Sequence, residues 1–208
     1  MSVRKTTSGA VVKNLEQEWI EKALHGDEES FTMLVNTYQT PVYNLCYRML
    51  GESTAAEDAA QETFWRAYQN LKRYDLQRSF VTWLLSIAAH YCIDQQRKRR
   101  IAIFELDEYP DLDFADPSIP TPEILTIKND EDQILHSMIN KLSPPDRAAV
   151  ILKYWYGCSE EEISQMLSLT ISAVKSRLDR ARRQLAESIM AGRTIIMEGG
   201  RQNESSAV

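Results

Sequence analysis

The chain has 208 residues, a formal net charge of −6 and 43% apolar residues. That length allows one domain or two small ones, and the apolar fraction is that of an ordinary globular protein. Three scattered cysteines, Cys46, Cys92 and Cys158, suggest neither a disulfide framework nor a paired zinc motif. Residues 1–14 lack the apolar stretch of a signal peptide, and the longest apolar run, 83–89, is too short to span a bilayer. We therefore expect a soluble, cytoplasmic protein with reduced thiols and no membrane insertion.

The first hundred residues read as helix almost throughout. After a polar tail over 1–14, apolar spacing predicts helices at 15–24 and around 31–38. Pro41 is expected to open a further helix, because proline is tolerated in a first turn, and Gly51 to end it.

Two more helix starts are predicted before residue 100. Thr54 and Glu57 have the spacing of a capping box for a helix that runs to about Leu71. Ser79 can cap a long helix to about Arg99, whose four basic residues, 97–100, complement the dipole at its end.

Residues 101–121 are acidic, contain several prolines and sustain no helical or strand period, which is typical of an extended linker. A second helical block is expected to start at Thr121 and Pro122. Predicted caps within the second block are Ser143, Gly157, the pair Ser159 and Glu162, and Thr170.

No strand-like alternation is found, so the predicted fold is all-α, with two small helical domains and an acidic linker. The expected divisions are a disordered tail (1–14), a first domain (15–100), the linker (101–121), a helix-turn-helix domain (122–190) and a second disordered tail (191–208).

Positive charge is concentrated on the last predicted helix. Residues 170–185 carry five basic residues and one acid, whereas 15–71 carry ten acids and three bases. A short helix, a tight turn and a basic second helix are typical of a helix-turn-helix that reads DNA. Its apolar stripe leaves Lys175, Ser176, Asp179, Arg180 and Arg183 facing outward; Arg177, Arg182 and Arg183 suit phosphates. A merely solvated basic face is the alternative. Because the rest of the chain is acidic, we expect weak DNA binding by the chain alone.

Two further surfaces stand out in the first half. Asp58, Gln61, Glu62 and Trp65 recur at helical spacing, on the face expected to point away from the core stripe of Phe64, Tyr68 and Leu71. That face suits a protein interface or an ordinary solvated face. The stretch 74–83 mixes aromatic and polar residues and leads to a basic end, which suits single-stranded nucleic acid unless its aromatics are core.

The sequence gives little support for a catalytic function. His25, His90 and His136 fall in separate elements, and no glycine-rich phosphate loop or nucleophile motif is present. We expect no enzymatic activity, no cofactor and no metal site.

Four stretches together resemble the extracytoplasmic-function (ECF, group 4) sigma factors of bacterial RNA polymerase. They are LCYRMLG (45–51), AEDAAQETFWRAY (56–68), SFVTWLLSIAAHYCIDQQRKRR (79–100), and a C-terminal run from LSPPDRAAVILKYW through SEEEISQMLSLTISAVKSRLDRARRQL. The resemblance covers about residues 24–100 and 132–189.

The resemblance implies a role for each part. The first domain would be region 2, whose 56–68 helix would dock on the β′ clamp helices of core polymerase. The second would be region 4, reading the −35 element and meeting the β flap. The acidic linker would follow the RNA exit path, and an anti-sigma factor would hold the protein inactive until an inducing stress.

The resemblance also implies site residues. For core polymerase they are Asp58, Gln61, Glu62, Trp65 and Arg66. For the single-stranded −10 element and its opening they are Asp75, Gln77, Arg78, Ser79, Phe80, Trp83, His90 and Arg97, although the family usually has asparagine at position 90. For the double-stranded −35 element they are Lys175, Ser176, Arg177, Arg180, Arg182 and Arg183, with Lys175, Ser176 and Arg180 facing bases.

Two other interpretations stay open at this point. One is a free-standing helix-turn-helix regulator, which would dimerise and bind duplex DNA alone. The other is a nucleic-acid-processing enzyme with a helical accessory domain, which would need metal-dependent turnover.

Overall fold

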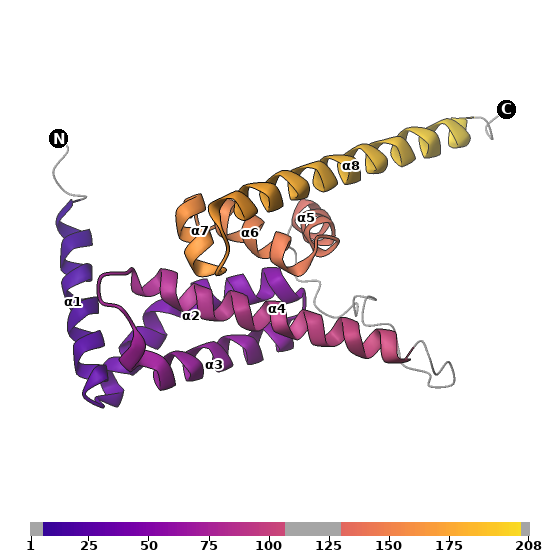
Figure 1. Cartoon of the computed structure of the whole chain (residues 1–208). Helices are drawn as coiled ribbons and strands as arrows, with labels where there is room; N and C mark the ends of the chain where they lie inside the picture. Colours follow the sequence, from indigo (N-terminus) through magenta and orange to yellow (C-terminus); the bar gives the residue numbers. More distant parts are fainter. Residues whose placement is uncertain (1–5, 107–129, 205–208) are drawn as a thin grey trace. The chain divides into compact units, whose positions relative to one another are not determined.

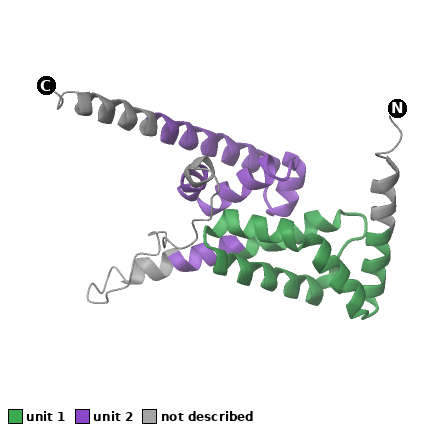
Figure 2. Ribbon diagram, turned by 180° about the vertical axis from the view of Figure 1, so that it is seen from behind, with its two compact units in different colours: residues 1–91 green, residues 92–208 purple. Residues whose placement is uncertain are grey.

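The computed structural model describes residues 6–106 and 130–204, with side chains described for 15–99 and 135–190. It divides into two compact units, residues 1–91 and 92–208 (Figure 2). All described regular structure is helical. The elements are α1 (Thr6–Leu24), α2 (Glu28–Leu50), α3 (Ser53–Asn70), the 3₁₀ turn η1 (Leu71–Arg73), α4 (Phe80–Leu106), α5 (Asp130–Asn140), α6 (Pro144–Tyr154), α7 (Glu160–Met166) and α8 (Ile171–Glu204) (Figure 1).

In the first unit α2 packs against both α1 and α3, and α1 crosses the other helices at a steep angle in both views (Figures 1 and 2). The start of α4 joins them through the rings of Tyr38 and Phe80, whose centroids lie 5.5 Å apart. Fully buried side chains from all four helices form one core. Its largest members are Ile20, Leu34, Val42, Leu45, Met49, Phe80 and Leu84.

Helix α2 corrects the prediction that Pro41 opens a separate helix. Pro41 lies inside one continuous helix of 23 residues. An internal proline costs about 3 kcal/mol. Burial of Leu34 before it, and of Val42 and Leu45 after it, offsets that cost because each contributes roughly 1.5–3 kcal/mol.

The start of α3 is also corrected. Its N-cap is Glu52 rather than Thr54, and the Glu52 carboxylate accepts hydrogen bonds from the backbone N–H groups of Thr54 (2.6 Å) and Ala55 (2.8 Å). A carboxylate just before the helix satisfies two free amides and is also favoured by the helix dipole.

Three predicted boundaries differ from the structure. Helix α1 begins at Thr6 and α8 continues to Glu204, so residues 6–14 and 191–204 are helical rather than unstructured. Helix α4 runs past Arg99 to Leu106, so its basic residues do not lie at its end. Extending a helix costs less than starting one, and none of these extensions meets a proline. The start expected at 121–122, and the linker beyond 106, lie outside the described residues.

The second unit is built on α8, whose first half packs against α5, α6 and α7 (Figure 1). Ser143 caps α6, as predicted, by accepting a hydrogen bond from Asp146 N–H. Helix α6 ends at Tyr154 with Trp155 as its C-cap, so Gly157 does not cap it; Gly157 lies two residues later with a φ of 66°. The core of this unit includes Ile139, Ile151, Leu152, Ile163, Val174, Leu178 and Ala181.

No helix in the described part of the chain is both long enough and apolar enough to cross a membrane.

Candidate functional site

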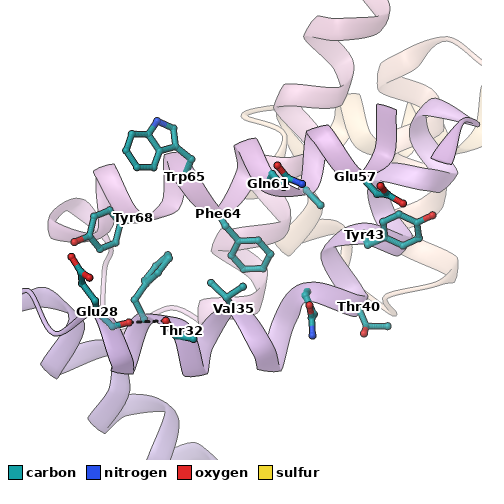
Figure 3. A pocket seen from close by; sticks show the side chains of 13 residues that line it. Glu28, Thr32, Val35, Thr40, Tyr43, Glu57, Gln61, Phe64, Trp65 and Tyr68 are labelled. Atoms are coloured by element: carbon teal, nitrogen blue, oxygen red, sulfur yellow. Dashed lines mark hydrogen bonds between the residues drawn. The ribbon is translucent and has the colours of Figure 1, made fainter. Parts of the chain in front are cut away.

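A surface groove of about 770 Å³ lies between α2 and α3. Phe64 of α3 and Val35 of α2 point into the space between the helices, and Trp65 points away from α2 (Figure 3). Trp65 is 57% exposed, although a side chain of that size is usually covered. The groove therefore offers an apolar floor with an uncovered indole at its rim.

The groove contains only some of the residues predicted to contact core polymerase. Gln61 and Trp65 line it together with Phe64 and Tyr68. The sequence pattern placed Gln61 and Trp65 on the face opposite Phe64 and Tyr68, and this was wrong. Phe64 is buried as predicted, at 9% exposure, whereas Tyr68 is 37% exposed and packs edge-on against Phe31.

The charged members of that predicted set lie apart from the apolar floor. Glu62 and Arg66 form an ion pair with 2.7 Å between Oε1 and Nε, and Asp58 is exposed. Arg66 also lies over the ring of Tyr91 in α4, with its Cζ 4.8 Å from the centroid. Arg66 thus reaches the α4 side of the unit.

An aromatic cluster supports the loop between η1 and α4. Tyr74, Phe80 and Trp83 form three ring contacts with centroids 5.0–5.6 Å apart. Phe80 is 1% exposed and Tyr74 8%, whereas Trp83 is half-buried. In this conformation Phe80 contributes to the core, and Trp83 is the cluster member with an accessible edge.

The loop itself is held by its own hydrogen bonds. Tyr74 donates its phenol hydrogen to the carbonyl of Arg78, and Asp75 accepts from the backbone N–H of Gln77 at 3.0 Å. Asp75 and Arg78 also form an exposed ion pair at 3.6 Å. The side chains of Asp75, Gln77, Arg78 and Ser79 are all exposed, so the loop offers polar groups on a rigid base.

A smaller hollow of about 350 Å³ opens beside this cluster. It brings together the predicted residues Trp83 and His90 with Asn70 and Arg73, which the sequence analysis missed. Arg66 also lines this hollow. The spacing of residues 66, 70 and 73 could have indicated the hollow, because it places their side chains on one side of α3 and η1. His90 is exposed and its Nδ1 lies 2.8 Å from the carbonyl oxygen of Ser86. Arg97, further along α4, is exposed.

Helices α7 and α8 form a helix-turn-helix. Ser159 and Glu162 make the predicted capping box at the start of α7. The turn includes Ser168 with a φ of 55°, a left-handed conformation uncommon outside glycine. Thr170 accepts a hydrogen bond from Ala173 N–H at 3.1 Å and so caps α8 as predicted.

The buried stripe of α8 orients its polar side. Val174, Leu178 and Ala181 are at most 1% exposed. This burial leaves exposed the side chains of Lys175, Ser176, Asp179, Arg180, Arg182 and Arg183, while Arg177 is intermediate.

Most of the basic side chains on α8 have acidic partners. Lys175 pairs with Glu160 of α7 at 3.6 Å. Arg177 and Arg180 both pair with Asp146 of α6, at 3.0 and 3.3 Å.

The other two of the five basic side chains described on α8 differ in their partners. Arg182 pairs with Asp179 at 2.7 Å and donates to the hydroxyl of Tyr154 at 2.9 Å. Arg183 has no ion-pair partner among the residues described. The role of Asp146 was missed because nothing in the spacing of residues 146 and 177 indicates that they meet.

No group of three His, Cys, Asp or Glu side chains is placed to hold a metal ion within the described ranges.

The two units match two family models in order. Residues 34–101 match Sigma-70 region 2, and residues 132–185 match Sigma-70 region 4. An all-helical chain with these two regions belongs to the class of promoter-recognition proteins called sigma factors.

Curated relatives narrow the class. The chain is 34% identical over 181 residues to the ECF RNA polymerase sigma factor SigW of Bacillus subtilis, covering 82% of this chain and 94% of that one. It is 35% identical over 159 residues to the ECF RNA polymerase sigma factor SigE of Mycolicibacterium smegmatis, covering 76% of this chain and 61% of that one. The chain therefore belongs to the ECF sigma factors. The free-standing regulator is not favoured, because the match extends over both units.

Solved structures share the fold. CnrH, solved in complex with the cytosolic domain of CnrY, has a TM-score of 0.61 and 24% identity, covering 85% of this chain and 98% of that chain. RpoE of Bartonella quintana, a sigma factor solved with the anti-sigma factor NepR, has a TM-score of 0.60 and 22% identity, covering 78% and 98%.

Proposed function

We propose that this sigma factor divides its work between the two units. The α2–α3 groove binds core RNA polymerase, the 74–79 loop and the start of α4 hold the opened −10 strand, and α8 reads the −35 duplex. The protein performs no covalent chemistry and works in the cytoplasm. The observation that carries the proposal is the occurrence of both regions, in order, on one chain.

The contact with core polymerase is assigned to the groove because of its chemistry. An apolar floor bordered by an exposed tryptophan is the pattern of a protein interface, where Trp and Arg are common anchors. A groove between two packed helices suits a helical segment that lays an apolar face into it, the role proposed for the β′ clamp helices. Gln61 and Trp65 are the contacts proposed here, with Asp58, Glu62 and Arg66 at the polar rim.

The single-stranded contact is assigned to the loop because its polar side chains are exposed while its aromatic base is rigid. Asp75, Gln77, Arg78 and Ser79 can reach the edges of an unstacked base. The edge of Trp83, with Arg73 and His90 nearby, suits stacking and backbone contacts. Taking a base out of the stack costs a few kcal/mol, which binding to core enzyme helps to supply.

The −35 contact is assigned to the first three turns of α8. In a helix-turn-helix the residues near the start of the second helix reach base edges in the major groove. Lys175, Ser176 and Arg180 are exposed there. Arg183, which lacks an acidic partner among the described residues, is the best candidate for a phosphate contact.

Family membership also supports control by an anti-sigma factor. Such a partner would compete with core polymerase for the exposed surfaces of one or both units.

In vitro transcription tests the proposal. Purified chain and core enzyme are incubated with a library of promoter fragments. We expect transcripts whose start sites lie downstream of a shared pair of spaced promoter elements. Their synthesis should require both the chain and core enzyme. Transcription that starts at the same sites without the chain would contradict the proposal.

A further inference from the structure

Among the side chains described in the second unit, Asp146 is the most deeply buried acidic one, at 2% exposure, and it joins α6 to α8. Its two carboxylate oxygens have different partners. Oδ1 accepts from Nη1 of Arg177 at 3.0 Å, and Oδ2 accepts from Nη1 of Arg180 at 3.3 Å. One carboxylate therefore holds two guanidinium groups that lie three residues apart on α8.

The carboxylate is itself fixed in place. Asp146 lies in the first turn of α6, and its backbone N–H donates to the capping hydroxyl of Ser143. Residues 147–152, which follow it in α6, are all buried, so the helix start cannot move without disturbing the core. The position of Asp146 is thus set by α6, independently of any bound DNA.

Its two partners differ in exposure. The Arg177 side chain is 25% exposed and the Arg180 side chain 56%. Arg177 is drawn toward the interior by its pairing, whereas Arg180 keeps part of its guanidinium in solvent. A charged pair with one deeply buried member is screened little by salt.

The other ion pairs of α8 are weaker restraints. Arg182 and Asp179 are 52% and 63% exposed, and Lys175 is 60% exposed at 3.6 Å from Glu160. Exposed pairs contribute little at physiological salt and rearrange easily. Phosphates can replace such partners, but they cannot easily replace a carboxylate buried beneath the helix.

We propose that Asp146 is a positioning residue for promoter selectivity. It holds the exposed end of Arg180 in one direction for base contact and keeps Arg177 from binding phosphates. The inference rests on the proposed role of α8 at the −35 element. It predicts that the buried carboxylate lowers non-specific affinity and raises the preference for the correct sequence.

The test uses holoenzyme assembled with wild-type chain or with Asp146→Asn, which keeps shape and removes charge. The probes are a promoter fragment recovered from the library and the same fragment with its −35 element scrambled, measured across a salt series. Glu187→Gln is the matched control, because it makes the same charge change on α8 at an exposed residue without a described ion pair.

We expect Asp146→Asn to reduce the preference for the intact −35 element about tenfold, the scale of one lost base contact. We also expect log affinity to fall more steeply with log salt, by about one, because the released Arg177 neutralises one more phosphate. Adding Arg177→Ala should restore the salt slope but not the preference. Glu187→Gln should change neither quantity.

An equal loss of affinity for both fragments with an unchanged slope would mean a merely structural role and would overturn the inference. If wild-type holoenzyme itself ignores the scrambling, the proposed role of α8 fails instead.

A second measurement needs no variant. NMR relaxation of the guanidinium N–H groups in the free wild-type chain should show Arg177 and Arg180 restricted relative to Arg183. Equal mobility of all three would overturn the proposal even if Asp146→Asn did not fold.

Discussion

Tyr74 closes the loop before α4 by donating its phenol hydrogen to the backbone carbonyl of Arg78. The ring of Tyr74 also packs against Phe80 and Trp83. A buried aromatic base therefore fixes the loop whose exposed side chains are proposed to hold the −10 strand.

Tyr74→Phe should loosen the loop while leaving the protein folded. The ring contacts remain, so the free energy of unfolding should fall by only about 1 kcal/mol for the lost hydrogen bond. Promoter opening by holoenzyme, measured with permanganate at saturating core enzyme, should fall by a larger factor. Thr37→Val is the control, since it also removes one hydroxyl hydrogen bond to a backbone carbonyl, that of Met33, at a residue outside both the loop and the groove. Equal opening by the two variants would count against a role for the loop.

The same phenol gives a pH prediction. Burial raises the pKa of Tyr74 to about 12, whereas tyrosine in an unfolded chain titrates near 10. The folded state therefore binds this proton more tightly. Its contribution to stability should be complete below about pH 10 and should decline as the pH rises toward 12. In spectrophotometric titration, Tyr74→Phe should remove one phenol that titrates late; loss of an early-titrating phenol would contradict the assignment.

Trp65→Ala tests the groove. Because the indole is 57% exposed, its removal should leave no cavity and should change the free energy of unfolding by no more than about 0.5 kcal/mol. Affinity for core polymerase should fall by about 2 kcal/mol, the scale of an interface hot spot. Met33→Ala is the matched control: Met33 is an exposed apolar residue of α2, 44% exposed, that does not line the groove. The double change Gln61→Ala with Glu62→Ala should also weaken association. Unchanged affinity in both Trp65→Ala and the double variant would remove the groove from the interface.

Arg180→Ala should reduce transcription from promoters that need the −35 element while leaving core binding intact. The loss should be about 1–3 kcal/mol in discrimination, as for one base contact. Arg183→Ala should instead weaken binding to all sequences and make the salt slope shallower by about one. If Arg180→Ala abolished core binding, the assignment of α8 to DNA would be in error.

The cysteines should be unreactive in the folded protein. Cys46 and Cys92 are fully buried, and burial raises the pKa of the Cys158 thiol. Because the thiolate is the reactive form, labelling by a disulfide reagent at neutral pH should be slow until the chain is unfolded. Fast modification of a native thiol would instead indicate an accessible redox-sensitive cysteine.

The fold class was predictable from sequence because apolar spacing and several caps agree along the chain. Ser143, Thr170 and the pair Ser159 and Glu162 cap where local chemistry indicates. The prediction at Pro41 was wrong because tertiary burial outweighs the local rule that a proline opens a helix. Glu52 was overlooked because Thr54 and Glu57 gave the better-known motif two residues later.

The candidate surfaces were predictable only in part. Exposure of Trp65 follows from its place beside the apolar stripe of α3, but the groove depends on how α2 lies against α3. The pairing of Asp146 with Arg177 and Arg180 joins residues more than thirty positions apart, so local pattern could not reveal it. Charge counted along α8 therefore overstated how much of it is free for DNA.

The central claim is that two weakly binding units become selective only when core polymerase holds them. Fluorescence anisotropy with a labelled promoter duplex tests this directly, with the purified chain alone and with added core enzyme. We expect selective binding of the promoter only in the presence of core enzyme. Tight and sequence-selective binding by the chain alone would contradict the account.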